Sequence, residues 1–359
     1  MNKKIIFLTP VPTPYQIAFA EALQNHLSIE FWFLTSIRDS TRPIYWERDI
    51  PSYCRILPTR LRKQQLFFCP GLTGMLSHFN PDCIILHGKW NNISWFFAYR
   101  WAIRNHKTII MGPLEAPTKQ NWFKEVLRKL IYRKIDAYLC VGYKSLDYYA
   151  SLKKENKAYM LSYAADLERE LTHPLRKPEP RITFLHSGSI NDRFRVQDIL
   201  KTFERLAVIY PDIRLILSGS GPVKEKCKTT IQESTVLATR VTWVEVNSWE
   251  EVQDLYLLAN VLISYPSYAG WGLTIPEAMA SGMGIIAGNC VEAGRELIIE
   301  GYNGFLVSDN RELEQAMLSY LVDPTKASQH GAINKAIAPK EGCHEKAKYL
   351  AHLLRLIVN

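Results

Sequence analysis

The segment at residues 266–282 combines residue types that suit the binding of a phosphorylated ligand. It follows an apolar run, and Gly270 and Gly272 allow the backbone to approach a ligand closely. Pro276 favours the start of a helix, whose free N–H groups form a site for an anion such as phosphate. Glu277 then lies in the first helical turn, where its carboxylate can accept hydrogen bonds from sugar hydroxyls. A glycine-rich turn with a structural glutamate is the alternative interpretation, and it stays open.

Three further side chains lie where strands are expected to end. His87 and Lys89 follow one predicted strand, and Glu115 follows the next one along the chain. Because ligands bind at the carboxyl ends of parallel strands, these side chains can contact a ligand. For each of the three, an ordinary exposed or hydrogen-bonded side chain is the alternative.

These residues need a scaffold, and the chain of 359 residues is long enough for two domains. Strands alternate with helices in both halves, which favours parallel sheets covered on both faces. We therefore predict an α/β protein with two Rossmann-like, doubly wound domains that face a central cleft. The strands are predicted at residues 4–9, 29–34, 83–86, 108–111, 137–141, 182–186, 214–218, 241–244, 261–265, 284–287 and 304–307. The helices are predicted at residues 15–26, 95–105, 122–134, 196–210, 249–259, 275–280 and 345–357.

The boundary between the domains is predicted beside a proline-rich segment, residues 172–180, which we interpret as a hinge. The first domain then comprises residues 1–170, with the C-terminal helix at 344–359 packing back on it. The second domain comprises residues 171–343.

Composition excludes several classes of protein. A hydrophobic content of 47% excludes a largely disordered chain, and no apolar run reaches the ~18–20 residues of a membrane span. The N-terminus mimics a signal peptide, but Pro10, Pro12 and Pro14 interrupt its apolar run, which favours a first strand. The seven cysteines are scattered without a Cys-x-x-Cys pair, which predicts reduced thiols in a cytoplasmic protein. No cluster with metal-ligand spacing stands out, so no metal and no cofactor are expected.

The net charge of +9 is unevenly distributed, with +12 in residues 1–165 and −3 in residues 166–359. A basic half is compatible with nucleic acid, an anionic membrane surface or an anionic substrate. The basic residues are dispersed and no nucleic-acid motif occurs, which disfavours nucleic acid. The run Gly219-Ser220-Gly221-Pro222 lacks the Gly-x-Gly-x-x-Gly spacing of a dinucleotide enzyme.

The segment at 266–282 resembles the nucleotide-sugar motif of family 4 retaining glycosyltransferases, which have the two-domain GT-B fold. That motif has two glutamates eight positions apart around Gly-aromatic-Gly-Leu, followed by Glu-Ala-Met-Ala-x-Gly. This chain has Gly270-Trp271-Gly272-Leu273 and then Glu277-Ala278-Met279-Ala280-Ser281-Gly282. Similar landmarks occur in the family's order over nearly the whole chain, at residues 13–15, 81–88, 162–166, 185–190, 217–222, 255–261 and 302–307.

The resemblance implies that residues 1–170 form the acceptor side and residues 171–343 the donor domain. The implied donor- and nucleotide-binding residues are Gly188, Ser189, Arg193, Arg195, Gly219, Val244, Gly270, Trp271, Gly272, Leu273, Thr274 and Glu277. Glu277 is expected to hold the ribose hydroxyls. The acceptor-side candidates are Pro12, Thr13, Tyr15, His87 and Lys89, and Glu115 is the candidate catalytic residue.

The chain departs from the family pattern at three positions. Ala269 replaces the first motif glutamate, which is expected to contact the transferred sugar. Ser189 and Phe194 replace an arginine and a lysine that are expected to contact the diphosphate. Arg193 and Arg195 flank Phe194, and either can supply a guanidinium or be a solvated surface charge. The prolines of residues 10–14 lie where the family often has glycines, which removes backbone donors.

The resemblance implies an enzyme that transfers a sugar, with retention, from a UDP-type or GDP-type nucleotide sugar to an acceptor hydroxyl. The acceptor is expected to be a sugar or a lipid-linked sugar in bacterial surface polysaccharide or glycolipid assembly. A silent GT-B protein, which binds a nucleotide sugar or a partner without turnover, is the alternative.

Residues 121–135 contain apolar residues at helical spacing together with many lysines and arginines. A second basic stretch contains Arg55, Arg60, Arg62 and Lys63. We expect reversible binding to an anionic membrane surface, at the inner face of the membrane. A core helix with a solvated basic face is the alternative.

Overall fold

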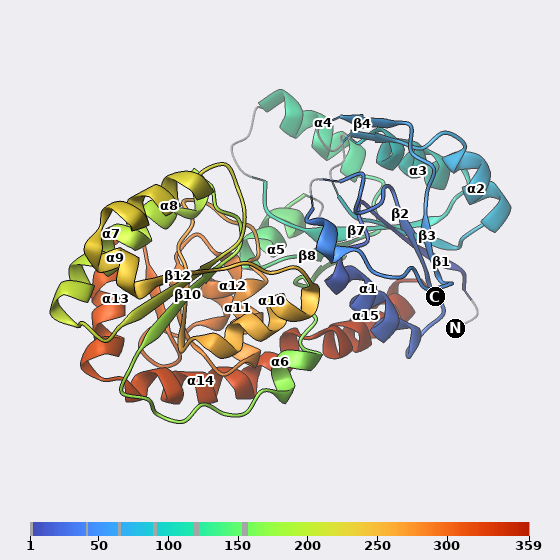
Figure 1. The fold of residues 1–359 in the computed structure, drawn as a ribbon. Coiled ribbons are helices and arrows are strands. Elements are labelled where there is room, and N and C mark those ends of the chain that lie inside the picture. Colours follow the sequence, from blue (N-terminus) through green and yellow to red (C-terminus); the bar gives the residue numbers. More distant parts are fainter. Residues whose placement is uncertain are drawn as a thin grey trace. The chain divides into compact units, whose positions relative to one another are not determined.

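The computed structural model describes residues 3–40, 42–63, 66–88, 92–117, 122–152 and 157–358. The chain divides into unit 1, residues 1–166 and 343–359, and unit 2, residues 167–342. In each unit, helices cover a parallel sheet (Figure 1). The chain passes from one unit to the other at Asp166–Leu167, ahead of the proline-rich segment where we expected a hinge.

Unit 1 is built on a seven-stranded parallel sheet with the order β3-β2-β1-β6-β7-β8-β9. Its strands are β1 (Ile5–Thr9), β2 (Glu30–Phe33), β3 (Cys54–Ile56), β6 (Cys83–Leu86), β7 (Thr108–Leu114), β8 (Ala137–Cys140) and β9 (Lys157–Met160). The strands β4 (Leu61–Lys63) and β5 (Leu66–Phe68) form a separate antiparallel pair. The helices are α1 (Pro14–Gln24), α2 (Leu72–Phe79), α3 (Ile93–Arg104), α4 (Trp122–Tyr132), α5 (Tyr143–Ala150) and α15 (Cys343–Ile357), with a 3₁₀ turn at Ile44–Trp46.

The residues of β1 alternate between two hydrophobic cores, one on each face of this sheet. Ile5 and Phe7 pack in the core that contains residues of α1 and α15. Ile6 and Leu8 pack in the core that contains residues of α2 and α3. All four side chains are buried, as expected for a strand covered by helices on both faces.

The C-terminal helix α15 belongs to unit 1 and packs against α1. Its buried residues Ala347, Leu350 and Leu354 recur at spacings of three and four, which places them on one helical face. The backbone N–H of Cys343 donates to the carbonyl of Ala165 over 3.0 Å, so the chain re-enters unit 1 where it left it.

Unit 2 is built on a six-stranded parallel sheet with the order β12-β11-β10-β13-β14-β15. Its strands are β10 (Thr183–Ser187), β11 (Arg214–Ser218), β12 (Val241–Val244), β13 (Val261–Ser264), β14 (Gly284–Gly288) and β15 (Phe305–Val307). The helices are α6 (Glu168–Thr172), α7 (Val196–Ile209), α8 (Lys224–Glu233), α9 (Thr235–Arg240), α10 (Trp249–Leu255), α11 (Thr274–Ala280), α12 (Glu292–Leu297), α13 (Asn310–Val322) and α14 (Thr325–Ile337). Short 3₁₀ turns occur at Asp192–Phe194, Tyr256–Leu258 and Ala338–Glu341.

Both sheets reverse their strand order beside the first strand of the unit. In unit 1, β1 lies between β2 and β6, and in unit 2, β10 lies between β11 and β13. The loops at the carboxyl ends of these strands diverge, and open α/β sheets bind ligands at such points. Each unit therefore presents one candidate edge for a ligand.

The predicted fold class of two doubly wound α/β domains is confirmed. The central cleft remains a prediction. Strand β7 is longer than predicted and continues through Pro113 to Leu114, because its last residues pair with β8. The prediction missed several elements, among them β3, β9, α2, α5, α13 and α14.

No helix in the described part of the chain is both long and apolar enough to cross a membrane. All seven cysteines are free thiols, and six of them are buried.

Candidate functional site

Two glycine turns touch each other at the carboxyl edge of the unit 2 sheet. Gly188 follows β10, and Gly219 follows the neighbouring strand β11. Both residues have φ values near +135°, at +138° and +134°, which side chains disfavour. A Cβ atom on Gly219 would lie 1.7 Å from the carbonyl oxygen of Gly188. Only glycine at position 219 allows the two backbones to meet, so these predicted residues do lie together.

Val244 and Ser189 lie near this contact. Val244 ends β12 and pairs with Ser218, the residue before Gly219. Ser189 follows Gly188 in the first turn, whose next residue Ile190 donates its N–H to the carbonyl of Ser220 over 2.9 Å. The turns after β10 and β11 are therefore held together by backbone hydrogen bonds, and the predicted residues lie on one edge.

The loop at residues 266–273 joins β13 to α11 and is anchored to α12. The carbonyls of Gly270 and Trp271 accept hydrogen bonds from the N–H groups of Glu292 and Ala293, over 3.2 and 2.9 Å. Gly272 has a φ of +90°, and a Cβ there would lie 2.6 Å from the Val291 side chain. Trp271 is buried, whereas Leu273 and Thr274 are half-buried. The loop between β13 and α11 is thus held in place by the start of α12.

The start of α11 offers fewer free donors than the sequence predicted. The N–H groups of Ile275 and Glu277 donate to the carbonyls of Gly272 and Leu273, over 3.1 and 3.2 Å. Pro276 has no N–H. An anion site at this helix start remains a prediction, and it depends on the N–H groups of residues before Ile275.

Glu277 lies in the first turn of α11, as predicted, but only 6% of it is exposed. Its carboxylate accepts a hydrogen bond from the hydroxyl of Tyr256, which is fully buried. Burial and, after it, the Glu277 carboxylate hold the pKa of Tyr256 well above its usual range, so the hydroxyl stays a donor. A ribose contact for Glu277 remains a prediction, and it requires a carboxylate oxygen that still faces the ligand.

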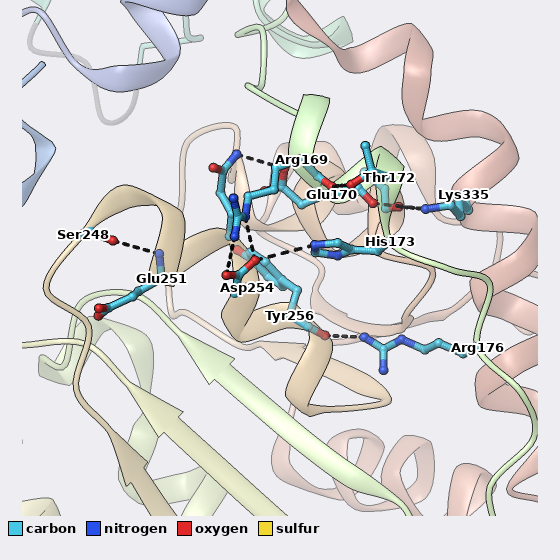
Figure 2. Close-up of polar contacts among 12 residues, drawn as sticks. Arg169, Glu170, Thr172, His173, Arg176, Ser248, Glu251, Asp254, Tyr256 and Lys335 are labelled. Carbon is cyan, nitrogen blue, oxygen red and sulfur yellow. Dashed lines mark hydrogen bonds and ion pairs between the residues drawn. The ribbon is translucent and has the colours of Figure 1, made fainter. Parts of the chain in front are cut away.

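Tyr256 is in turn held by the segment that follows α6 (Figure 2). Arg176 donates to the backbone carbonyls of Tyr256 and Ser281. Lys335 donates to the carbonyl of Ala280 over 2.8 Å, so two cations satisfy carbonyls at the C-terminal end of α11. These contacts fix the C-terminal end of the helix that carries Glu277.

One ion pair and one longer contact, made by α6 and the residue after it, fasten this region to α10. Arg169 donates to both carboxylate oxygens of Asp254 over 2.6 Å, and the Nε2 atom of the buried His173 lies 4.0 Å from Asp254 (Figure 2). The hydrogen bonds from Arg169 lower the pKa of Asp254. The proline-rich segment therefore begins as a bound part of unit 2.

The side chains of Arg193 and Arg195 have different surroundings. The Arg193 guanidinium carbon lies 4.5 Å from the ring centre of Phe194 and 5.1 Å from that of Tyr268. Its Nε atom is buried without a hydrogen-bond partner, and no carboxylate of the described residues pairs with it. Arg195 instead donates to the hydroxyl of Tyr265 over 3.0 Å. Arg193 is thus the cation that lies beside the loop at 266–273 with donors to spare.

In unit 1, the predicted acceptor-side residues gather around β1 and α1. Pro12 and Thr13 are buried, and Tyr15 is half-buried with its ring against Trp46. His87 follows β6, and its Nδ1 atom lies 2.8 Å from the hydroxyl of Thr9. Burial lowers the pKa of His87 to about 4. Lys89 lies outside the described residues.

Glu115 follows β7 and is exposed, as expected for a residue beyond the end of a strand. After burial, its charge is the next largest cause that raises the pKa of Tyr163. The structure thus brings Glu115 and Tyr163 near each other, whereas a catalytic role for Glu115 remains a prediction.

The prediction missed Tyr256, Tyr268, Thr9 and Gln16. Tyr256 lies within a segment that carried the family resemblance, which was its only signal in the sequence. Within the described residues, no group of three or more His, Cys, Asp or Glu side chains could hold a metal ion.

Comparison with known proteins connects these sites to sugar transfer. Residues 168–337 match the model of the family described as "Glycosyl transferases group 1". A lipopolysaccharide 1,6-galactosyltransferase of Salmonella typhimurium is 29% identical over 137 residues, and a trehalose synthase of Pyrococcus horikoshii is 24% identical over 239 residues. These matches cover 37% and 61% of this chain, and only 37% and 56% of the two relatives.

Solved structures share the fold over the whole chain. The HepE protein of Anabaena in complex with UDP has a TM-score of 0.73 at 14% identity, over 98% of this chain and all of that one. The lipopolysaccharide outer core galactosyltransferase WaaB has a TM-score of 0.68 at 18% identity, over 98% of this chain and 99% of that one. At these identities the similarity shows the fold alone.

The strength of the buried hydrogen bond between Tyr256 and Glu277 can be tested by comparison with the buried contact between Tyr320 and His330. We expect Tyr256→Phe to lower the free energy of unfolding by roughly 1.5–3 kcal/mol, because a charged acceptor loses its donor. Tyr320→Phe removes an equally buried hydroxyl that contacts the neutral ring of His330, and it should cost about 0.5–1.5 kcal/mol. Urea denaturation of both variants measures the difference. A smaller loss in Tyr256→Phe than in Tyr320→Phe would contradict the assignment of a charged carboxylate.

Proposed function

Since the chain belongs to the glycosyl transferases group 1 family through residues 168–337, we propose that it transfers a sugar, with retention, from a nucleotide-diphosphate sugar to an acceptor hydroxyl. The observation that carries the proposal is that the matched residues form unit 2, including its glycine turns and the loop at 266–273. The donor nucleotide is of the UDP or GDP type. The acceptor is a sugar or lipid-linked sugar of a bacterial surface polysaccharide or glycolipid, which the similarity to a lipopolysaccharide galactosyltransferase supports.

The edge of the unit 2 sheet supports the binding of a diphosphate. Gly219 presents backbone without a side chain, so a phosphate oxygen can approach its N–H group. The N–H of Gly188 donates to the carbonyl of Ser218 over 3.1 Å, so Gly188 contributes space for the ligand and not a free donor. Arg193 adds a guanidinium beside the loop at 266–273. Backbone donors and a fixed cation stabilise the charge that develops on a departing diphosphate.

The reaction then proceeds as expected for the retaining glycosyltransferases that this chain resembles. The acceptor attacks the anomeric carbon on the face from which the diphosphate leaves, which retains the configuration. The departing phosphate accepts the proton of the acceptor hydroxyl. Glu277 holds the ribose hydroxyls, and Glu115 contacts the acceptor or the transferred sugar.

A silent protein that binds a nucleotide sugar or a partner without turnover is the second candidate. Ala269, Ser189 and Phe194 favour it, because they replace three residues that are expected to bind the donor. The two candidates differ in turnover, so one assay separates them.

The proposed function is tested by nucleotide release from a panel of UDP- and GDP-sugars, with and without simple sugar acceptors. We expect release from one donor, increased by an acceptor. Binding of a donor by calorimetry without any release would favour the silent protein instead. No binding and no release across the panel would refute both candidates.

The contrast between Arg193 and Arg195 generates a second prediction. Arg193→Ala should slow turnover roughly 30- to 1,000-fold, because a charge-assisted contact of about 2–4 kcal/mol is lost in the transition state. Arg195→Ala, the matched control, should slow turnover less than about tenfold, because its guanidinium is engaged with Tyr265. Steady-state rates of both variants measure the contrast. The reverse order would assign the diphosphate contact to Arg195.

Helix α4 supports the proposed membrane contact. Trp122, Val126 and Leu130 recur every four residues, and their exposed fractions are 76, 49 and 57%. Lys129 and Arg133 are exposed beside them. Of the predicted apolar face, Val126, Leu127 and Leu130 are thus exposed, whereas Ile131 is half-buried and packs against a hydrophobic core. The exposed apolar side chains and the basic residues together suit an anionic lipid headgroup layer. The side chains of Phe123, Arg62 and Lys63 lie outside the described residues.

Sedimentation with anionic vesicles tests this contact. Each basic residue near an anionic surface contributes ~1 kcal/mol, so Lys129→Gln with Arg133→Gln should weaken binding roughly 30-fold at low salt. Lys348→Gln with Lys157→Gln removes two exposed charges elsewhere in unit 1 and should have little effect. Equal binding of the wild type to neutral and anionic vesicles would exclude the proposed contact.

A further inference from the structure

A chain of three side chains crosses the point where the unit 1 sheet reverses its order. Thr9 ends β1 and His87 follows the neighbouring strand β6. Gln16 lies one turn into α1, the helix that follows β1. The hydroxyl of Thr9 lies 3.2 Å from Oε1 of Gln16 and 2.8 Å from Nδ1 of His87. A ligand at this edge would meet these residues.

The hydrogen-bonding capacity of the three groups determines which nitrogen of His87 carries its proton. The amide oxygen of Gln16 can only accept, so the single hydrogen of the Thr9 hydroxyl is donated to it. The Thr9 oxygen then has only lone pairs for His87, so Nδ1 must donate to it. A neutral ring with hydrogen on Nδ1 has a lone pair on Nε2, which is an acceptor.

The surroundings keep this arrangement fixed. Thr9 is fully buried and Gln16 is 8% exposed, so water does not compete for the hydrogen bonds between them. Removal of the imidazole from water lowers the pKa of His87 to about 4, and the ring is neutral at pH 7. The half-buried ring contacts those of Phe7 and Tyr163, at centroid distances of 6.1 and 5.8 Å.

There is room for a ligand hydroxyl nearby. A cavity of about 20 Å³, which can hold one water-sized group, is lined by Gln16 and by Phe7 and Tyr163, whose rings contact His87. His87 itself does not line it. Within the described part of the chain, Nε2 of His87 has no hydrogen-bond partner, and the ring that carries it is half-buried. An acceptor atom without a partner at a ligand-binding edge suits a donor of the ligand.

We propose that Gln16 and Thr9 are positioning residues that hold the hydrogen of His87 on Nδ1, so that Nε2 accepts a hydrogen bond from a hydroxyl of the acceptor sugar. The identification of that sugar as an acceptor rests on the proposed function, whereas the tautomer does not. The contact orients the sugar, and His87 takes no proton from it.

The tautomer can be measured directly by ¹⁵N NMR of the full chain, because the shifts of the two ring nitrogens differ between tautomers. The signals of His87 are identified by their loss in His87→Asn. We expect hydrogen on Nδ1 in the wild type and in Gln16→Glu, which keeps an acceptor for Thr9. In Gln16→Leu the Thr9 hydroxyl is free to donate to His87, so the hydrogen should move to Nε2. Hydrogen on Nε2 in the wild type, or no change in Gln16→Leu, would overturn the proposal.

Sugar binding is tested by saturation-transfer NMR with a panel of methyl hexopyranosides. His87→Asn keeps an amide where Nδ1 contacts Thr9 but has nothing at the position of Nε2. It should weaken the binding of at least one methyl glycoside roughly three- to twelvefold, the effect of one hydrogen bond. His87→Gln places an amide near the position of Nε2 and should bind more tightly than His87→Asn. No binding by the wild type, or equal affinity in all three proteins, would overturn the proposal.

The outcomes separate this inference from the proposed function. Nucleotide release by the wild type together with equal glycoside affinity in His87→Asn refutes the role of His87 and leaves sugar transfer standing. The expected tautomer and affinity changes without release from any donor refute sugar transfer and support His87 as a sugar-binding residue.

Discussion

The contact between the backbones of Gly188 and Gly219 constrains the whole edge of the unit 2 sheet. These turns follow adjacent strands, and a side chain on Gly219 would occupy the position of the Gly188 carbonyl. Without side chains, the turns leave open the space at the carboxyl ends of β10 and β11, where N–H groups can meet an anion. The loop at 266–273 lies beside Arg193, whose carbonyl accepts a hydrogen bond from Ser267 and whose guanidinium faces Tyr268, and the proposed diphosphate site depends on both.

A second constraint is the buried carboxylate of Glu277. A charge that is 6% exposed must be hydrogen-bonded, and Tyr256 provides a donor from the turn after α10. The segment after α6 then holds Tyr256 and the end of α11 through Arg176, while Lys335 contacts α11 from α14. Elements distant in sequence thus hold one helix in place, which supplies the rigidity that a binding carboxylate requires.

In unit 1, the buried polar side chains at the sheet edge are neutral. Thr9, Gln16 and His87 are joined by hydrogen bonds in a nearly dry environment, which makes the direction of each bond definite. Other basic residues of this unit lie elsewhere, and Lys129 and Arg133 are on the surface near exposed apolar side chains of α4. The excess positive charge of residues 1–165 therefore suits an anionic surface more than it suits the polar network at the sheet edge.

The sequence by itself determined the elements whose signals are local. Buried parallel strands are continuous apolar runs, so 83–86 and 214–218 were predicted with the bounds that β6 and β11 have. The helix α7 was predicted within one residue, since its apolar residues recur at helical spacing. The helix α13 had a local signal that was overlooked: Asp309 accepts a hydrogen bond from the N–H of Glu312, as a capping residue does.

Tertiary structure alone decided which candidate residues can act. Glu277 was placed in the correct turn from sequence, but its partner Tyr256 is 21 residues away and reaches it only because the 3₁₀ turn after α10 lies beside α11. The hydrogen bond between Thr9 and His87 joins residues 78 positions apart, because β1 and β6 are neighbours in the sheet. Arg193 and Arg195 are the same residue type on either side of Phe194, so the sequence does not distinguish them. Their contacts do, because Arg195 donates to Tyr265 whereas the guanidinium of Arg193 lies over the ring of Tyr268. Local patterns specify secondary structure, whereas the protonation, burial and hydrogen-bond partners of a side chain depend on contacts between residues distant in sequence.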